Sequence, residues 1–162
     1  MTAMAPARTE TDLSFLLDHT GRVLRARVAA ALGEIGLTAR MHCVLVHALE
    51  EERTQIQLAE LGDMDKTTMV VTVDALEKAG YAVRRPSSTD RRARIISVTA
   101  AGAEVARRSQ EIVDGVHRAA LGSLPSGERD VLVRALNRLA TGHLATPGDG
   151  DRPARRARES AK

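Results

Sequence analysis

The residue types in this sequence best suited to binding chemistry are arginines crowded into one short segment. Five of them fall within eleven residues, opposed by one carboxylate, Asp90. These arginines are Arg84, Arg85, Arg91, Arg92 and Arg94. Guanidinium groups suit both phosphate oxygens and the narrow minor groove of DNA, and an ion pair with Asp90 would hold the Arg92 side chain extended. The cluster indicates a polyanionic partner; the alternative is a charged loop that is only solvated.

A β-hairpin is predicted to carry these arginines. Short strands are expected over residues 81–85 and 93–98, the second of them rich in β-branched side chains. The residues between them, 86–90, have the composition of a turn. The arginine cluster therefore lies on an exposed hairpin.

Two short helices are predicted just before the hairpin. The first begins at a capping box made by Thr54 and Gln57 and ends near Gly62. The second is capped by Asp65 and ends before Gly80. Because the turn between them is brief, the helices must cross. This order of elements predicts a winged helix-turn-helix, in which the second helix enters a major groove and the hairpin is the wing.

Helical periodicity continues on both sides of this unit. It runs over residues 12–32 and 39–51 before the two short helices, over 99–121 after the hairpin, and again from 125 onward. The fold class expected is mostly α with a small β-hairpin wing.

Composition bounds the function. The chain has 162 residues, 43% hydrophobic and 28% charged, with a formal net charge of +3 and a single cysteine. This suits one globular domain without a disulfide framework. We find no apolar run of membrane-spanning length and no signal-peptide pattern, so a cytoplasmic location is expected. We also find no phosphate-binding glycine loop, paired carboxylates or nucleophile elbow, so we expect neither an enzyme nor a metal or cofactor.

Four segments together resemble the signature of the MarR (multiple antibiotic resistance regulator) family of transcription regulators. They are residues 76–81 (LEKAGY), Arg85, 90–92 (DRR) and 98–102 (VTAAG). The likeness extends over residues 12–143. It implies a homodimer in which the first, fifth and sixth helices pair between subunits. It also implies that Arg92 enters the minor groove, braced by Asp90, with the other arginines of the wing near the DNA.

Composition and the resemblance together predict a division of the chain into four parts. They are a disordered N-terminus (1–10), a helical dimerisation region (11–36 and 100–143), a winged helix-turn-helix domain (37–99) and a disordered basic tail (144–162).

The recognition helix departs from the family pattern. Family members often carry Thr-Arg where this chain has Val70 and Val71. Reading of the major groove by an arginine is therefore unavailable, while apolar contact of Val71 with thymine methyl groups is possible. Packing in the core is an equal alternative for either valine. The remaining candidates for base contact are Lys66, Thr67, Thr68 and Val71.

A small anionic effector is also implied, since family members often bind one between the dimerising helices and the winged domain. His19 and Arg22 are three residues apart on one helical face, and Arg40 and His42 open the next helix. These four residues could hold a carboxylate such as citrate or aconitate. The chain also bears a fainter resemblance to family members that respond to citrate or aconitate. The alternative to an anion site is a basic face that is only solvated. His42 could titrate near neutral pH, and the alternative is a packed neutral ring. Cys43 is expected to be a buried, inert thiol.

Together these features predict a ligand-responsive repressor that binds a pseudo-palindromic operator as a homodimer. The expected partners are double-stranded DNA, a second copy of the chain and a small-molecule effector, with no membrane. The alternative is a winged-helix module that binds protein and not DNA. The arginines of the wing favour DNA, because a protein-binding surface there should show exposed apolar anchors.

Overall fold

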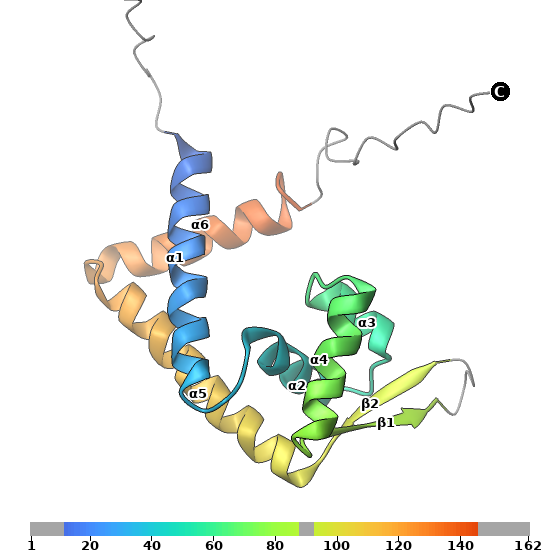
Figure 1. The fold of residues 1–162 in the computed structure, drawn as a ribbon. Coiled ribbons are helices and arrows are strands. Elements are labelled where there is room, and N and C mark those ends of the chain that lie inside the picture. The colour runs from blue at the N-terminus through green and yellow to red at the C-terminus, as the bar shows by residue number, and fades with distance from the viewer. Residues whose placement is uncertain (1–11, 88–92, 146–162) are drawn as a thin grey trace, which may run out of the picture. The chain divides into compact units, whose positions relative to one another are not determined.

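A computed structural model describes residues 12–87 and 93–145 (Figure 1). The chain divides into two compact units, one ending at Ala120 and one beginning at Leu121. The helices and strands, in chain order, are α1 (Leu13–Gly33), α2 (Ala39–Glu50), α3 (Gln55–Leu61), α4 (Lys66–Lys78), β1 (Ala82–Pro86), β2 (Arg94–Val98), α5 (Ala100–Gly122) and α6 (Ser126–Thr141). The predicted fold class is confirmed: the described chain is mostly helical, with a two-stranded antiparallel hairpin as the wing.

Side-chain caps fix the starts of the first four helices. Asp12, Thr38, Thr54 and Asp65 each accept a hydrogen bond from a backbone N–H in the first turn of the helix that follows. The predicted capping box at α3 is present, since the Thr54 N–H also donates to the Gln57 side chain at 2.8 Å. These caps satisfy backbone donors that a helix start otherwise leaves without partners. The predicted helix starts are confirmed to within a residue.

The wing pairs in a register that runs from Ala82 opposite Val98 to Pro86 opposite Arg94. The strands differ from the prediction at their ends. The first begins one residue later than expected and takes in Pro86, which we had assigned to the turn. A proline is tolerated at this terminal position because it costs no interior ladder hydrogen bond. The predicted turn residues 88–90 lie outside the described residues.

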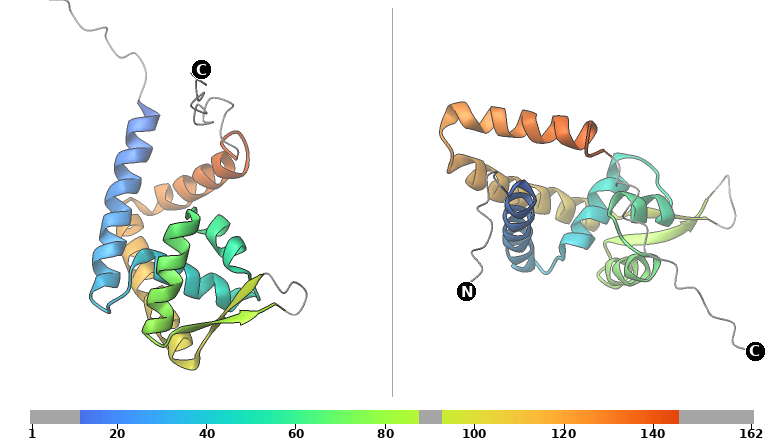
Figure 2. Two further views of the ribbon diagram at one scale, coloured as in Figure 1. Left: turned by 45° about the vertical axis from the view of Figure 1, so that its right-hand side comes forward. Right: turned by 90° about the horizontal axis from the view of Figure 1, so that it is seen from above.

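The hairpin is also joined to the chain just before α3. Thr54 forms an isolated antiparallel bridge with Ile95, and the Ile96 N–H donates to the Arg53 carbonyl at 3.3 Å. In both views of Figure 2 the hairpin extends away from the start of α5, on the side of α3 and α4. The wing is therefore anchored through β2 to the residues just before α3.

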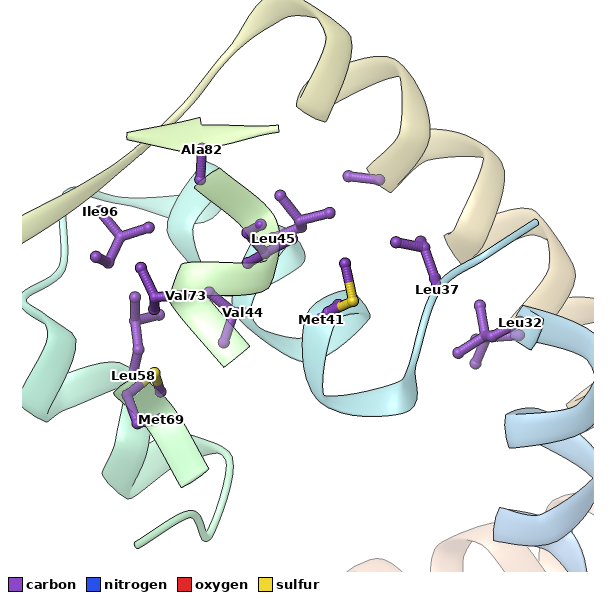
Figure 3. Close-up of a cluster of buried hydrophobic side chains, with 13 residues drawn as sticks. Leu32, Leu37, Met41, Val44, Leu45, Leu58, Met69, Val73, Ala82 and Ile96 are labelled. Carbon is purple, nitrogen blue, oxygen red and sulfur yellow. The ribbon is translucent and has the colours of Figure 1, made fainter. Parts of the chain in front are cut away.

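The core of the first unit lies between α2, α4 and the hairpin (Figure 3). Leu45, Val73, Leu76 and Ile96 are each almost completely buried. Leu32 from the end of α1 joins the same cluster. Aliphatic side chains form this core, as expected from a sequence with only 1% aromatic residues. It fixes one face of α4 and leaves the other face to solvent.

The junction between the wing and α5 explains one of the sequence motifs. The Thr99 N–H donates to the Tyr81 carbonyl at 3.0 Å, and the Thr99 hydroxyl donates to the Gly80 carbonyl at 2.7 Å. The same hydroxyl accepts from the Gly102 N–H at 3.0 Å. A Cβ atom at position 102 would lie 1.9 Å from the Tyr81 oxygen. Residues 98–102 (VTAAG) thus hold the start of α5 against the wing. Gly102 permits the close approach of α5 to the Tyr81 carbonyl.

The second unit contains α6, and none of the residues of that helix is buried. Four of its large apolar side chains are exposed, Val131, Leu132, Val133 and Leu136, while Leu139 is half-buried. Among the described residues, no helix combines the length and the apolar character needed to cross a membrane.

Candidate nucleic-acid interface

The second helix of the helix-turn-helix, α4, presents an exposed stripe that begins at Lys66 and Thr67. One turn further on, Val71 is 62% exposed. The opposite side of the helix packs Met69 and Val73 into the core. The open question about Val71 is therefore answered by its exposure: it is a surface residue of the recognition helix.

Thr68 belongs to the helix cap rather than to the exposed stripe. Its hydroxyl donates to an Asp65 carboxylate oxygen at 2.7 Å, and its backbone N–H donates to the other oxygen at 2.8 Å. These bonds lower the pKa of Asp65 from its ordinary value, so the cap stays ionised. Because Thr68 is half-buried and its only hydroxyl proton is used here, its side chain orders the start of α4.

The structure changes the role that we assign to Arg84. We expected it to contact DNA, but its guanidinium is occupied within the protein and its side chain is only 23% exposed. It pairs with Asp74 at 2.7 Å and with Glu77. It also donates to the Gln55 side chain at 3.2 Å and to the Val70 carbonyl at 3.3 Å. Arg84 therefore ties the wing to both helices of the helix-turn-helix.

The neighbouring arginine, Arg85, points elsewhere. Successive side chains of a strand point to opposite faces, so Arg85 is turned away from the Arg84 side, and it is exposed. Arg94, which pairs with Pro86 across the hairpin, is also exposed. The other predicted wing contacts, Asp90, Arg91 and Arg92, lie outside the described residues.

A hollow of about 600 Å³ opens between α3, the start of α4 and the start of β2. Ile56, Met64 and Met69 contribute its apolar lining, and Lys66 and Arg94 contribute cationic groups. None of the four residues predicted to hold an anionic effector lines this hollow.

His42 makes a contact that the sequence did not indicate. Its Nδ1 lies 2.8 Å from the hydroxyl of Ser109, a fully buried residue of α5. That hydroxyl donates its only proton to the Ala106 carbonyl at 2.7 Å, so it accepts from His42 and Nδ1 carries the imidazole proton. Burial lowers the pKa of His42, and the neighbouring His47 lowers it further. His42 is therefore a neutral link between α2 and α5.

The other predicted effector residues are dispersed. His19 and Arg22 do share a face of α1, with the guanidinium 3.4 Å from the histidine Nδ1. However, His19 lies 13 residues before Leu32, the α1 residue that enters the core, or roughly 20 Å along a helix. Arg40 is near the carboxylate of Asp65, whose pKa it helps to lower. Within the described chain these residues do not form one site.

Cys43 is half-buried, and burial is the main cause that raises the pKa of its thiol. A raised pKa keeps the sulfur protonated and unreactive, because the thiolate is the nucleophile. This agrees with the expected inert thiol.

Sequence reasoning missed Asp74, Gln55 and Ser109. Each acts through a partner on another element, and sequence spacing does not show which elements meet. For Val71 a signal was available. Burial of residues 69, 72, 73 and 76 follows helical spacing, which places position 71 on the outer face.

The crossing helices α3 and α4, with the hairpin joined to them through Arg84, define a winged helix-turn-helix protein. Comparison with known proteins agrees. A family model described as MarR family matches residues 35–93, which run from before α2 to just past the wing loop. Over its helix-turn-helix and wing, the chain is similar to the MarR family of winged helix transcriptional regulators. Regulators of this family are not enzymes.

Solved structures of three related proteins show the extent of the likeness. A MarR-family regulator from Rhodococcus sp. RHA1 has 28% identity and a TM-score of 0.73, covering 83% of this chain and 96% of that one. CouR from Rhodococcus jostii RHA1, solved with p-coumaroyl-CoA, has 28% identity and a TM-score of 0.70 over 83% and 96% of the two chains. Rv2887 of Mycobacterium tuberculosis, solved with DNA, has 26% identity and a TM-score of 0.69 over 80% and 98%.

Proposed function

We propose that this chain is a cytoplasmic, ligand-responsive repressor that binds a pseudo-palindromic DNA operator as a homodimer. The recognition helix α4 would enter the major groove and the arginine-rich wing the adjacent minor groove. In a two-fold dimer, the two copies of α4 would reach half-sites about one helical turn apart.

The observation that carries the proposal is the attachment of an exposed helix face to a basic hairpin. Lys66, Thr67 and Val71 face outward on α4. Arg84 holds the base of the wing to that helix, while Arg85 and Arg94 remain exposed on the wing. We infer that Arg91 and Arg92, at the tip, add phosphate or minor-groove contacts with Asp90 as the brace. Two related proteins, the repressor CouR and Rv2887, were solved bound to DNA.

Dimerisation is proposed for residues 11–36 and 100–143. Most of the large apolar side chains of α6 are exposed, and so are Leu13, Phe15, Leu16 and Leu17 at the start of α1. Apolar surface on two helices is typical of a face that a partner covers.

An effector is proposed from the relatives. CouR was solved with p-coumaroyl-CoA and Rv2887 with p-aminosalicylic acid, so aromatic acids and their CoA thioesters join citrate and aconitate as candidates. The residues proposed for contact remain His19, Arg22, Arg40 and His42. Since one chain does not assemble all four, a shared site would need a second subunit.

The test of DNA binding is selection of the full-length protein on a random duplex library, followed by fluorescence anisotropy on the selected duplex. We expect a two-fold symmetric sequence to be enriched. Its binding should weaken with salt, because each neutralised phosphate contributes about −0.9 to the slope of log K against log salt concentration. The contrary outcome is that no sequence is enriched and that the chain binds every duplex as weakly as it binds random DNA. In that case the protein-binding alternative replaces this proposal.

The effector is tested separately by melting the protein with p-aminosalicylate, p-coumarate or citrate. A ligand at a hundredfold excess over its dissociation constant should stabilise the folded state by about 2.7 kcal/mol. It must also weaken operator binding, because only a ligand with different affinities for two states shifts their populations. Failure of all three acids to move the melting temperature would remove aromatic acids and citrate as effectors.

A further inference from the structure

The outer face of α4 contains few groups that can read a base by hydrogen bonds. Its exposed residues are Lys66, Thr67, Val70, Val71, Asp74, Ala75 and Lys78. The side chains that recognise guanine or adenine with two hydrogen bonds are arginine, lysine, asparagine and glutamine. Of these types, this face has only lysines, one at each end of the helix, Lys66 and Lys78. The one carboxylate of the face, Asp74, lies 2.7 Å from Arg84 and is occupied by that ion pair.

We infer that Val71 reads the 5-methyl group of thymine in the major groove, so that operator recognition depends on that methyl at a fixed position of each half-site. This inference rests on the DNA binding proposed above. In the major groove, thymine is distinguished by its methyl group, which apolar side chains contact.

The geometry of α4 suits such a contact. Val71 is 62% exposed at the centre of the helix, and its neighbours Met69 and Val73 are buried and hold the helix in place. The preceding carbonyl, that of Val70, accepts a hydrogen bond from Arg84. A valine in a helix has one strongly preferred rotamer, so its methyl groups lose little freedom on binding.

The same face is poorly suited to a protein partner. The side chains that dominate protein interfaces are mainly tryptophan, tyrosine and arginine, while valine is under-represented among them. The apolar stretch is bordered by Lys66 and Thr67 at one end and by the Asp74–Arg84 pair at the other. Pairing of Asp74 with Arg84 also removes a negative charge that would repel phosphate. These features favour the major groove of DNA as the occupant.

The experiment replaces thymine by uracil, which lacks only the methyl group. Each thymine of the selected operator is exchanged in turn, and binding of the full-length protein is measured by anisotropy. We expect the exchange to weaken binding about fourfold at one position per half-site, which corresponds to ~0.8 kcal/mol for one buried methyl group. The ratio of the thymine and uracil affinities should not change with salt, since an apolar contact releases no counterions.

Val71→Ala should reduce the thymine-to-uracil ratio at that position to less than about twofold. The variant should fold, because the side chain is exposed and alanine favours a helix. The matched control is Val83→Ala, which truncates an exposed valine of β1 and should leave the ratio at its wild-type value.

The outcomes separate this inference from the proposed function. If the wild-type protein binds its operator but no uracil exchange matters, or Val71→Ala keeps the wild-type ratio, methyl reading by Val71 is overturned and DNA binding stands. If the protein selects no operator at all, the proposed function fails, and this inference fails with it.

Discussion

At the scale of single residues, Gly102 shows how a motif glycine is required by packing. Its Cα lies so close to the wing that an added Cβ would meet the Tyr81 carbonyl oxygen at 1.9 Å. That oxygen belongs to the backbone and already accepts from Thr99, so it cannot move aside as a flexible side chain would. The chain must shift instead, and the joint between wing and helix must open.

We therefore predict that Gly102→Ala lowers the free energy of unfolding by about 3 kcal/mol, at the upper end of overpacking costs. The matched control is Gly115→Ala on the same helix, where the nearest atom to an added Cβ is the end of the Arg118 side chain at 3.9 Å. Since alanine is a better helix former than glycine, the control should be neutral or stabilising by up to ~1 kcal/mol. Urea unfolding measures both. Equal effects of the two variants would contradict the close approach at Gly102.

A second prediction at this scale concerns His42. Because burial lowers its pKa in the folded protein, the unfolded chain takes up a proton at a higher pH than the folded chain does. The contribution of His42 to stability is therefore complete above the unfolded value near 6.5 and declines as the pH falls through the lowered folded value. His47 on α2 and His117 on α5 oppose protonation, whereas Asp114 favours it.

The test compares wild type with His42→Gln, whose side chain can donate a hydrogen bond but cannot titrate. Between pH 7.5 and 5.5, the wild-type protein should lose more unfolding free energy than the variant. The comparison cancels the titration of other histidines to first order. A parallel loss in both proteins would assign the pH dependence to groups other than His42.

At the scale of elements, the wing and the recognition helix act as one body because of Arg84. We predict that Arg84→Met weakens operator binding without changing the salt slope, because Arg84 makes its ion pairs with Asp74 and Glu77 and not with phosphate. Arg85→Ala provides the contrast. Its guanidinium is exposed, and its loss should reduce the magnitude of the slope by about one.

Anisotropy titrations over a range of salt concentrations distinguish the two roles. If the magnitude of the salt slope decreases in Arg84→Met as much as in Arg85→Ala, Arg84 contacts DNA after all. Melting temperatures show whether loss of affinity in Arg84→Met comes only from unfolding, since removing the arginine leaves two carboxylates without their partner.

The elements also show which features a sequence can predict. Thr54 and Gln57 predicted the start of α3 because a capping box is local, with both partners three residues apart. Gly80 marked the end of α4 for the same reason, and its positive φ of 74° is the conformation that glycine adopts freely. The end of β1 was missed, because pairing with Arg94 across the hairpin decides it and turn composition does not.

The site was predicted in the same uneven way. The sequence predicted α4 and the hairpin after it, because both follow from element order, but it left Val70 and Val71 open between the surface and the core. It could not assign Arg84, since a free and a paired arginine look alike until the positions of Asp74 and Glu77 are known. Likewise Ser109, which holds His42, is 67 residues away along the chain.

At the scale of the whole molecule, the apolar surface of α6 requires an explanation. This helix has 16 residues, and none of them is buried. Leu132 and Leu136 are each 40% exposed and lie four residues apart, on one face of the helix. A short amphipathic helix gains most of its stability from packing this face, so a second copy of the chain is the expected cover.

We predict that the protein is a dimer at micromolar concentration and that Leu132→Glu combined with Leu136→Glu makes it monomeric. Carboxylates in a dimer contact would be buried without partners, which costs far more than the lost apolar area. Affinity for the full operator should then fall to that for an isolated half-site, because the second half-site is no longer bound intramolecularly. Sedimentation velocity gives the mass, and anisotropy on full and half operators gives the affinities. Val83→Glu, which places one carboxylate on an exposed valine outside α6, should remain dimeric. A wild-type protein that sediments as a monomer, or a double variant that still sediments as a dimer, would place the subunit contact elsewhere than on α6.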